Sequence, residues 1–244
     1  MMHTYPLMQT VFGKIVMCLN PRHSSLLFLE RIIFKKKHYR QITCISEQCK
    51  KEIVNHYNVS PHTIEIIYNG VNISIFTPKN RTTYRDTVRA TYGIAPDEVL
   101  LLFVGSGFKR KGLKYVIEAL SLINKSQKTK LLVVGKGTIR EHQRLARKNG
   151  VLDKLIFAGV CKHIQEIYAG GDIFVFPSEY DAFGTACLEA MASGLPVIAS
   201  KSSGVSEIIA QGQDGFVIHH PIDAREIAKY MNVLFTKEKR EQMG

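Results

Sequence analysis

The chain has 244 residues, of which 45% are hydrophobic and 22% charged, enough to bury a globular core of one domain or one and a half domains. No apolar run reaches the roughly 18 residues that cross a bilayer, which excludes a membrane-spanning helix. Half of the formal net charge of +12 lies in residues 1–60, where nine Lys and Arg residues accompany three Glu residues.

The beginning of the chain and its cysteines bear on the cellular compartment. Residues 1–18 are mildly apolar but lack a cationic start, a compact apolar block and a small-residue cleavage site, so no secretory signal is expected. The five cysteines are scattered and form no close C-x-x-C pair of the kind found in zinc sites and disulfide frameworks: Cys18, Cys44, Cys49, Cys161 and Cys187. A reducing cytoplasm is the expected location.

The basic segment 31–51, which includes Lys35, Lys36, Lys37 and Arg40, is open to two interpretations. One is a solvated basic surface. The other is attraction to an anionic membrane surface or a phosphorylated acceptor, which would hold the protein peripherally on the inner face of the plasma membrane. Nucleic acid is a less suitable partner, since no helix-turn-helix, zinc-finger or RNA-binding signature accompanies the charge.

From residue 42 onward, short β-branched runs alternate with amphipathic stretches. Strands are predicted at residues 42–46, 64–68, 99–104, 130–134, 154–157, 173–176 and 196–199. Strands separated by helix-length segments form parallel sheets covered by helices on both faces, and such sheets bind ligands beyond the carboxyl ends of their strands. The sequence therefore predicts an α/β fold with its functional residues in the strand-to-helix loops.

A polar stretch without periodicity, residues 76–85, separates the first two predicted strands from the rest and is interpreted as an interdomain connection. With a boundary near Lys79, residues 79–244 hold a nearly complete Rossmann-like domain. Residues 1–78 hold two strands, too few for a doubly wound sheet, and are interpreted as the end of a second Rossmann-like domain.

The loop Gly105-Ser-Gly-Phe-Lys-Arg-Lys-Gly112 follows the strand at 99–104 and precedes a helix predicted at residues 113–122. Its glycines let the backbone approach a ligand. Arg110 and Lys111, with a third cation beside them, stand at a helix start, where backbone N–H groups already favour anions. The pattern is typical of diphosphate binding, although exposed cations at a helix start are also common as plain surface.

The segment after the strand at 173–176 carries the strongest chemical pattern: a loop with a carboxylate at Asp181, and a helix that begins at Gly184 and carries a second carboxylate at Glu189. The first residues of a helix offer backbone N–H groups, so Gly184 and Thr185 are expected to bind phosphate. Glu189, about one turn deeper, can accept two hydrogen bonds from vicinal hydroxyls such as those of a ribose. Asp181 is expected to face the transferred sugar, although a capping role is also open to it.

Three stretches, in this order along the chain, resemble glycosyltransferase family 4 enzymes of the GT-B fold, and more closely the lipopolysaccharide core glucosyltransferase I group. They are a hinge at Asn69-Gly70-Val71-Asn72 with Phe76, a donor-phosphate loop from Val104 to Leu113, and an E-x7-E-like element from Asp181 to Glu189. The resemblance covers almost the whole chain from about Leu26 onward. It implies a GT-B type fold with one nearly complete Rossmann-like domain, the donor-binding one, plus the end of an acceptor-side domain.

The same resemblance implies a retaining transfer of a hexose, with glucose expected, from a nucleotide sugar such as UDP-glucose to a lipopolysaccharide, another saccharide or a glycolipid acceptor. Catalysis would involve Asp181, Arg110 and Lys111, the two cations neutralising the leaving diphosphate. Glu189 would hold the ribose, and main-chain groups near Val160 the base. The residues implied in donor binding are Gly105, Ser106, Gly107, Arg110, Lys111, Val160, Asp181, Ala182, Phe183, Gly184, Thr185 and Glu189. No metal and no cofactor is implied, and the chain contains no D-x-D triplet.

The chain departs from the family pattern at two residues and at its ends. Asp181 replaces the first Glu of E-x7-E, and Ser106 stands where many relatives have an Arg. The family also has a complete N-terminal domain with a glycine-rich acceptor-side loop, and a final helix that crosses back onto it, and neither is located in the sequence. We therefore expect an N-terminally truncated chain that binds a nucleoside diphosphate without metal but transfers little sugar alone.

Three alternatives stay open: a donor-binding fragment without activity, a GT-B-fold sugar-nucleotide epimerase, and a Rossmann oxidoreductase. The oxidoreductase is the least favoured, because the loop at Gly105 and the pair Gly135-Lys-Gly137 both lack the third glycine of a nicotinamide-binding fingerprint. Gly135-Lys-Gly137 is interpreted mainly as a tight turn.

Overall fold

The computed structural model describes residues 21–35, 39–124, 126–220 and 222–244 and divides into two compact units. The first unit consists of Met1–Asn69 with Tyr180–Phe183, and the second of Gly70–Glu179 with Gly184–Gly244. The sequence places the domain boundary near Lys79, and its assignment of an acceptor-side and a donor-side domain stays a prediction. The expected absence of a secretory signal concerns residues 1–18, which lie outside the described residues.

The described part of the first unit contains a short parallel strand pair and the helices around it. These elements are α3 (Pro21–Ile33), β1 (Ile42–Cys44), α4 (Glu47–Tyr57), the 3-10 helix η2 (Pro61–Thr63) and β2 (Ile64–Ile66). Ser46 caps α4, because its side chain accepts a hydrogen bond from the backbone N–H of Cys49 at 3.1 Å. A small core of Cys44, Val59 and Ile64 is buried in this unit.

The second unit contains a six-stranded parallel sheet in the order β5-β4-β3-β6-β7-β8. Its strands are β3 (Val99–Val104), β4 (Thr129–Val134), β5 (Leu155–Gly159), β6 (Ile173–Phe176), β7 (Val197–Ser200) and β8 (Gly215–Ile218). Numbered within the unit, this order is 3-2-1-4-5-6, the doubly wound order of dinucleotide-binding folds. Such an order places a ligand crevice where the chain direction along the sheet reverses, between β3 and β6.

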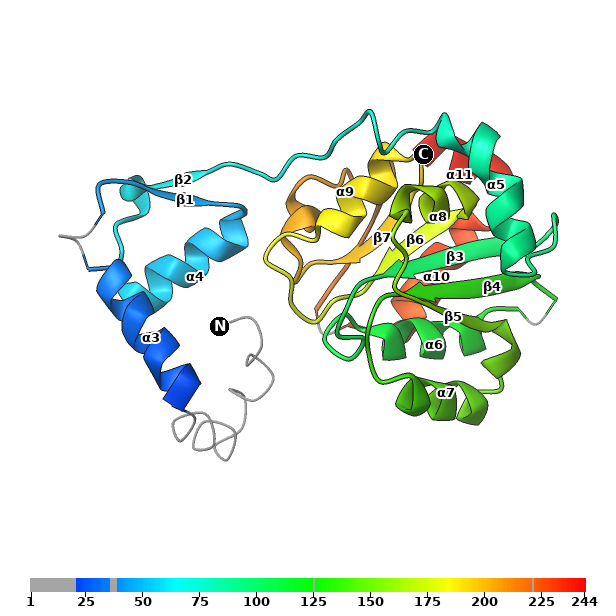
Figure 1. Ribbon diagram of the computed structural model, residues 1–244, viewed down its shortest axis with the longest axis horizontal. Helices are drawn as coiled ribbons and strands as arrows, with labels where there is room; N and C mark the ends of the chain where they lie inside the picture. Colours follow the sequence, from blue (N-terminus) through cyan, green and yellow to red (C-terminus); the bar gives the residue numbers. More distant parts are fainter. Residues whose placement is uncertain (1–20, 36–38, 125, 221) are drawn as a thin grey trace. The chain divides into compact units, whose positions relative to one another are not determined.

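Helices cover both faces of this sheet (Figure 1). One face carries α6 (Leu113–Leu122), α7 (Ile139–Lys148) and α10 (Ala224–Leu234), and the other carries α5 (Asn80–Thr91), α8 (Ile164–Gly170) and α9 (Thr185–Ala192). The remaining elements are η3 (Leu152–Lys154), η4 (Gly204–Glu207) and α11 (Lys237–Met243). Side chains along β3 point alternately to the two faces of the sheet, and each face has its own hydrophobic core. Leu101 and Phe103 belong to the core under α6, α7 and α10, and Leu100 and Leu102 to the core under α5, α8 and α9.

All seven predicted strands are present, with ends shifted by at most two residues, and the helix predicted at residues 113–122 is α6. The α/β class is therefore confirmed. The sequence did not predict β8, and residues 76–85, interpreted as a connection, contain the first turns of α5. The face of α5 that packs on α8 carries Arg81, Arg85 and Arg89 at four-residue spacing, so this helix lacks the apolar periodicity on which the prediction depended.

Candidate functional site

The two loops singled out from the sequence flank the same point of the sheet. The loop from Gly105 to Gly112 leaves the carboxyl end of β3, and the segment from Pro177 to Gly184 leaves the carboxyl end of β6, the neighbouring strand. Their backbones are joined, because the N–H of Glu179 donates to the carbonyl of Arg110 at 2.8 Å. The predicted phosphate loop thus lies at the point where a doubly wound sheet binds its ligand.

The close approach of these two loop backbones depends on Gly112. Its φ of +76° lies in the left-handed region, and a Cβ added there would stand 1.9 Å from the carbonyl oxygen of Pro177. No side chain fits between the two backbones. Gly112 therefore lets the start of α6, which follows Arg110 and Lys111, approach the β6 loop as closely as the site requires.

The second glycine pair supports the first loop. Gly107 N donates to the carbonyl of Lys136 at 2.7 Å, and Gly105 N donates to the carbonyl of Val134 at 2.9 Å. Lys136 N in turn donates to the Ser106 hydroxyl at 3.4 Å. These bonds agree with the interpretation of Gly135-Lys-Gly137 as mainly a structural turn, and they fix Gly105, Ser106 and Gly107 at the end of β3.

Lys111 extends from the predicted phosphate loop over the ring of Phe176. Its methylenes lie 3.5–3.7 Å from the point where a Cβ on Gly105 would stand, and its ammonium lies 4.6 Å from the centroid of the Phe176 ring. The same ring reaches within 3.2 Å of the point where a Cβ on Gly184 would stand. Phe176 therefore has the Lys111 cation on its face and Gly184, the residue that caps α9, at its edge.

The start of α9 has the predicted form. Gly184 caps the helix in a left-handed conformation with φ +93°, and Thr185, the first helical residue, is exposed. Helix N-termini favour anions through their backbone N–H groups and the helix dipole. A cation at Lys111 and a helix N-terminus at Gly184 thus lie on the same aromatic ring, an arrangement suited to a diphosphate.

Glu189 lies one turn into α9 and is half-buried. Its Oε2 accepts a hydrogen bond of 2.8 Å from the hydroxyl of Tyr168, a fully buried residue of α8. Burial raises the pKa of Glu189, and the hydrogen bond from Tyr168 acts in the opposite direction. Sequence reasoning did not find Tyr168, because nothing in its segment distinguishes a core tyrosine from one that binds a carboxylate.

Val160, predicted to lie near the base, follows β5 directly and is 61% exposed. The end of β5 is joined to the neighbouring turn, since Gly135 N donates to the carbonyl of Gly159 at 2.7 Å. The main chain at Val160 therefore lies at the same edge of the sheet as the phosphate loop, two strands away from β3.

Three predicted donor residues are grouped elsewhere: Asp181, Ala182 and Phe183 belong to the first unit and not to the unit that contains the other nine. Asp181 Oδ1 accepts a hydrogen bond from the backbone N–H of Phe183 at 3.1 Å. In the same unit the carbonyl of Ala182 accepts a hydrogen bond from the Ser46 hydroxyl at 2.8 Å. The role of Asp181 toward a sugar stays a prediction.

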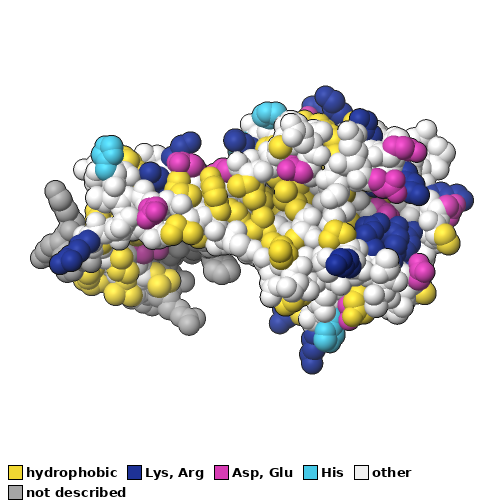
Figure 2. Space-filling model, turned by 90° about the horizontal axis from the view of Figure 1, so that it is seen from above, with side chains coloured by type: hydrophobic (Ala, Val, Ile, Leu, Met, Phe, Trp, Pro, Cys, Tyr) yellow, Lys and Arg dark blue, Asp and Glu magenta, His cyan; other side chains and the backbone are white. Residues whose placement is uncertain are grey.

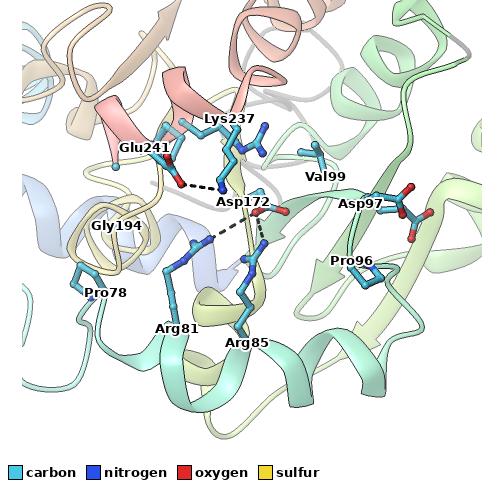
Figure 3. A pocket seen from close by; sticks show the side chains of 14 residues that line it. Pro78, Arg81, Arg85, Pro96, Asp97, Val99, Asp172, Gly194, Lys237 and Glu241 are labelled. Atoms are coloured by element: carbon cyan, nitrogen blue, oxygen red, sulfur yellow. Dashed lines mark hydrogen bonds and ion pairs between the residues drawn. The ribbon is translucent and has the colours of Figure 1, made fainter.

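A cavity of about 730 Å³ lies at the opposite edge of the sheet, near the amino ends of β3, β6 and β7. Figure 3 shows Arg81 and Arg85 pointing at Asp172, with Lys237 paired to Glu241 beside them. Arg85 donates to Asp172 at 2.7 Å and to the carbonyl of Gly171 at 3.0 Å, so its charge holds α5 to the end of α8. We assign this cluster to the stability of the unit.

The basic segment 31–51 is described in part, because Lys36 and Lys37 lie outside the described residues. Helix α3, which ends inside this segment, exposes Leu26, Phe28, Leu29 and Ile33. No helix in the described ranges has the length and apolarity needed to cross a bilayer.

On the face that Figure 2 shows, Lys and Arg side chains of the second unit lie interspersed with Asp and Glu side chains. The partner of the basic segment stays a prediction.

Two family models match the chain. Residues 84–244, about two thirds of the chain, match the model described as glycosyl transferases group 1. Residues 3–75 match the model described as glycosyltransferase family 4. The two matches cover the parts of the chain before and after the predicted connection, and they occur in the order that the sequence motifs indicated.

Two relatives illustrate the similarity. An uncharacterized glycosyltransferase of Methanocaldococcus jannaschii is 32% identical over 182 residues, which are 73% of this chain and 47% of that protein. The lipopolysaccharide glucosyltransferase WaaG of Escherichia coli K12 is 28% identical over 221 residues, which are 90% of this chain and 59% of that protein. The chain thus spans about half the length of the curated relatives it matches.

Solved structures show the same similarity. The crystal structure of WaaG, a glycosyltransferase involved in lipopolysaccharide biosynthesis, matches with a TM-score of 0.82 at 28% identity, over 92% of this chain and 61% of that one. HepE of Anabaena, solved in complex with UDP-glucose, matches with a TM-score of 0.77 at 21% identity, over 92% of this chain and 62% of that one. The likeness to HepE concerns the fold.

Proposed function

This chain belongs to the glycosyl transferases group 1 family, and from that premise we propose that it binds a nucleotide sugar and serves the transfer of its sugar to a saccharide. The family resemblance inferred from the sequence and the GT-B type of α/β fold are confirmed. One observation carries the proposal: the phosphate loop after β3, the start of α9 and Glu189 all lie where the order of the parallel sheet reverses.

The proposed donor is a uridine diphosphate sugar, with glucose as the hexose. Arg110 and Lys111 would bind the diphosphate together with the N-terminus of α9, and Glu189 would accept hydrogen bonds from the ribose hydroxyls. The main chain at Val160 would contact the base, and Asp181 the sugar. The complex of HepE with UDP-glucose supports this donor, because HepE shares the fold.

The proposed chemistry is transfer with retention of configuration. An acceptor hydroxyl attacks the anomeric carbon from the face that the diphosphate leaves, the bond between that carbon and the phosphate oxygen breaks, and the hydroxyl proton passes to the departing phosphate. Negative charge develops on the diphosphate, so preorganised cations and the helix dipole at Gly184 lower the barrier. No enzyme nucleophile and no metal is part of this proposal.

The proposed acceptor is a lipopolysaccharide or a related glycolipid, by analogy with WaaG. We place the protein in the cytoplasm, held at the inner face of the membrane by the basic segment 31–51. The exposed Leu26, Phe28, Leu29 and Ile33 of α3, just before and at the start of that segment, support this placement, because exposed apolar side chains next to cations suit the surface of an anionic membrane. Sedimentation with phosphatidylglycerol vesicles, against phosphatidylcholine vesicles as control, tests it.

A second candidate function is donor binding without transfer by this chain alone. The observation that favours it is the grouping of nine of the twelve predicted donor-binding residues in the second unit. Positioning an acceptor contributes on the order of 7 to 11 kcal/mol to such reactions in favourable cases, so a chain that binds only the donor would transfer slowly.

Saturation-transfer NMR with UDP-glucose in the presence of EDTA tests donor binding independently of turnover. The proposal predicts saturation transfer to uracil, ribose and glucose protons, and displacement by UDP. UDP-galactose and GDP-mannose serve as competitors that test the sugar and the base. If no nucleotide sugar shows saturation transfer, the protein does not bind a donor and the proposed function is contradicted. Donor binding with negligible glucosylation of lipopolysaccharide would favour the second candidate.

A further inference from the structure

The hydroxyl of Tyr168 lies within hydrogen-bond distance of two acceptors on α9. It is 2.8 Å from Glu189 Oε2 and 3.2 Å from the carbonyl oxygen of Ala186. A tyrosine has one O–H proton to donate, and a carboxylate accepts a shorter and stronger bond than a carbonyl. The proton therefore points at Glu189, and the contact with Ala186 is secondary.

The ring of Tyr168 is part of the core, but its hydroxyl is not needed there. The ring is fully buried, with Phe76 at a centroid distance of 5.8 Å and Phe174 at 5.9 Å. A phenylalanine would fill the same space without burying a polar group, which is costly unless it is hydrogen-bonded. The position of this hydroxyl in the apolar core is thus explained by Glu189.

Glu189 gains two properties from this bond. One carboxylate oxygen is tied to a rigid, buried partner, so the side chain loses little further rotational freedom when a ligand arrives, and Oε1 can still accept hydrogen bonds from that ligand. The bond also favours the ionised form of a carboxyl whose pKa is raised by burial. Burial and the charge of Glu189 raise the pKa of Tyr168 well above its ordinary value, so the hydroxyl stays a donor at physiological pH.

We infer that Tyr168 is the positioning residue of the donor site, which holds the Glu189 carboxylate ionised and oriented for the 2′- and 3′-hydroxyls of the nucleotide ribose. The inference rests on the proposed donor-binding function. A residue of α8, outside both predicted loops, would thus control ribose recognition.

The test is Tyr168→Phe, with Tyr230→Phe as the matched control, because Tyr230 is also buried and also donates to a glutamate, at 3.2 Å from Glu226 Oε1. Calorimetry compares UDP with 2′,3′-dideoxy-UDP. Tyr168→Phe should weaken UDP about fivefold, the net effect of one hydrogen bond, and leave the dideoxy analogue nearly unchanged. Tyr230→Phe should alter neither affinity.

A second readout needs no nucleotide. The pKa of Glu189, followed through its side-chain carboxyl carbon by NMR and assigned with Glu189→Gln, should rise in Tyr168→Phe, and the acid limb of UDP binding should move to higher pH with it. An unchanged pKa, or equal losses for UDP and the dideoxy analogue, would overturn the inference. The wild-type protein could bind UDP and 2′,3′-dideoxy-UDP equally well while the pKa of Glu189 still rises in Tyr168→Phe. That result would confirm the hydrogen bond between Tyr168 and Glu189 but refute Glu189 as the ribose ligand, and with it the inference.

Discussion

Replacing Gly112 by alanine tests whether UDP binding requires the close approach of the loops that follow β3 and β6. Its φ of +76° costs an alanine about 1 to 2 kcal/mol, and the new Cβ would stand 1.9 Å from the carbonyl oxygen of Pro177. The backbones must separate by about 1 Å before the contact reaches the 3.0 Å below which Cβ contacts are essentially never seen. Overpacking of this kind adds about 1 to 3 kcal/mol, so the free energy of unfolding should fall by about 2 to 5 kcal/mol.

The matched control is Gly150→Ala. Gly150 has a similar φ of +67°, but nothing lies within 4 Å of its added Cβ, so only the conformational cost of about 1 to 2 kcal/mol is expected. Urea unfolding measures both variants, and calorimetry measures their affinity for UDP. Gly112→Ala should lose UDP affinity even where it is fully folded, whereas Gly150→Ala should keep it. The reasoning is refuted if the two variants are equally stable and bind UDP equally well.

Three further substitutions test separate parts of the account. Glu189→Ala should weaken UDP by about 1.5 to 3 kcal/mol in calorimetry, since it removes a charge-assisted contact to the ribose, and unchanged affinity in a folded variant would contradict that role. Lys111→Ala should weaken UDP far more than uridine, because only UDP carries the diphosphate, and equal losses would remove Lys111 from the phosphate site. Asp172→Asn should lower the free energy of unfolding by about 3 kcal/mol, because the buried Arg89 and the half-buried Arg85 lose their carboxylate partner, whereas Asp97→Asn, at an exposed pair with Lys128, should change it little. Burial acts to raise the pKa of Asp172, but the charge of Arg85 and the hydrogen bonds hold it below its ordinary value. The stabilisation from Asp172 is therefore present at neutral pH and is lost as the pH falls below about 4. If acid lowers the stability of the wild type no faster than that of Asp172→Asn, this role of Asp172 is contradicted.

The strands and the loops of the second unit could be predicted from the sequence because they depend on local patterns. Buried parallel strands give short apolar runs, and a doubly wound fold brings the ends of β3 and β6 together, so the loop at Gly105 and the helix start at Gly184 were found from glycines and charge alone. Their position at one edge of the sheet followed from topology.

The features that could not be predicted from the sequence depend on tertiary contacts. The arginine stripe of α5 is explained by Asp172 and the carbonyl of Gly171, which lie more than 80 residues later in the chain. The contact between Gly112 and Pro177 and the bond from Tyr168 to Glu189 likewise join separate loops and helices, and neither leaves a local pattern. Strand β8 (Gly215–Ile218) begins at a glycine, which weakens a strand pattern, and its apolar residues 216–218 are followed directly by two histidines.

Calorimetry of nucleotide binding in the presence of EDTA decides whether the chain has the proposed donor site. We expect UDP to bind more tightly than GDP, ADP and NAD, uridine to bind more weakly than UDP, and added divalent metal to change the UDP affinity little. A chain that binds none of these nucleotides, that prefers NAD, or that binds UDP only with metal would contradict the assignment of a metal-independent donor site at Lys111, Gly184 and Glu189.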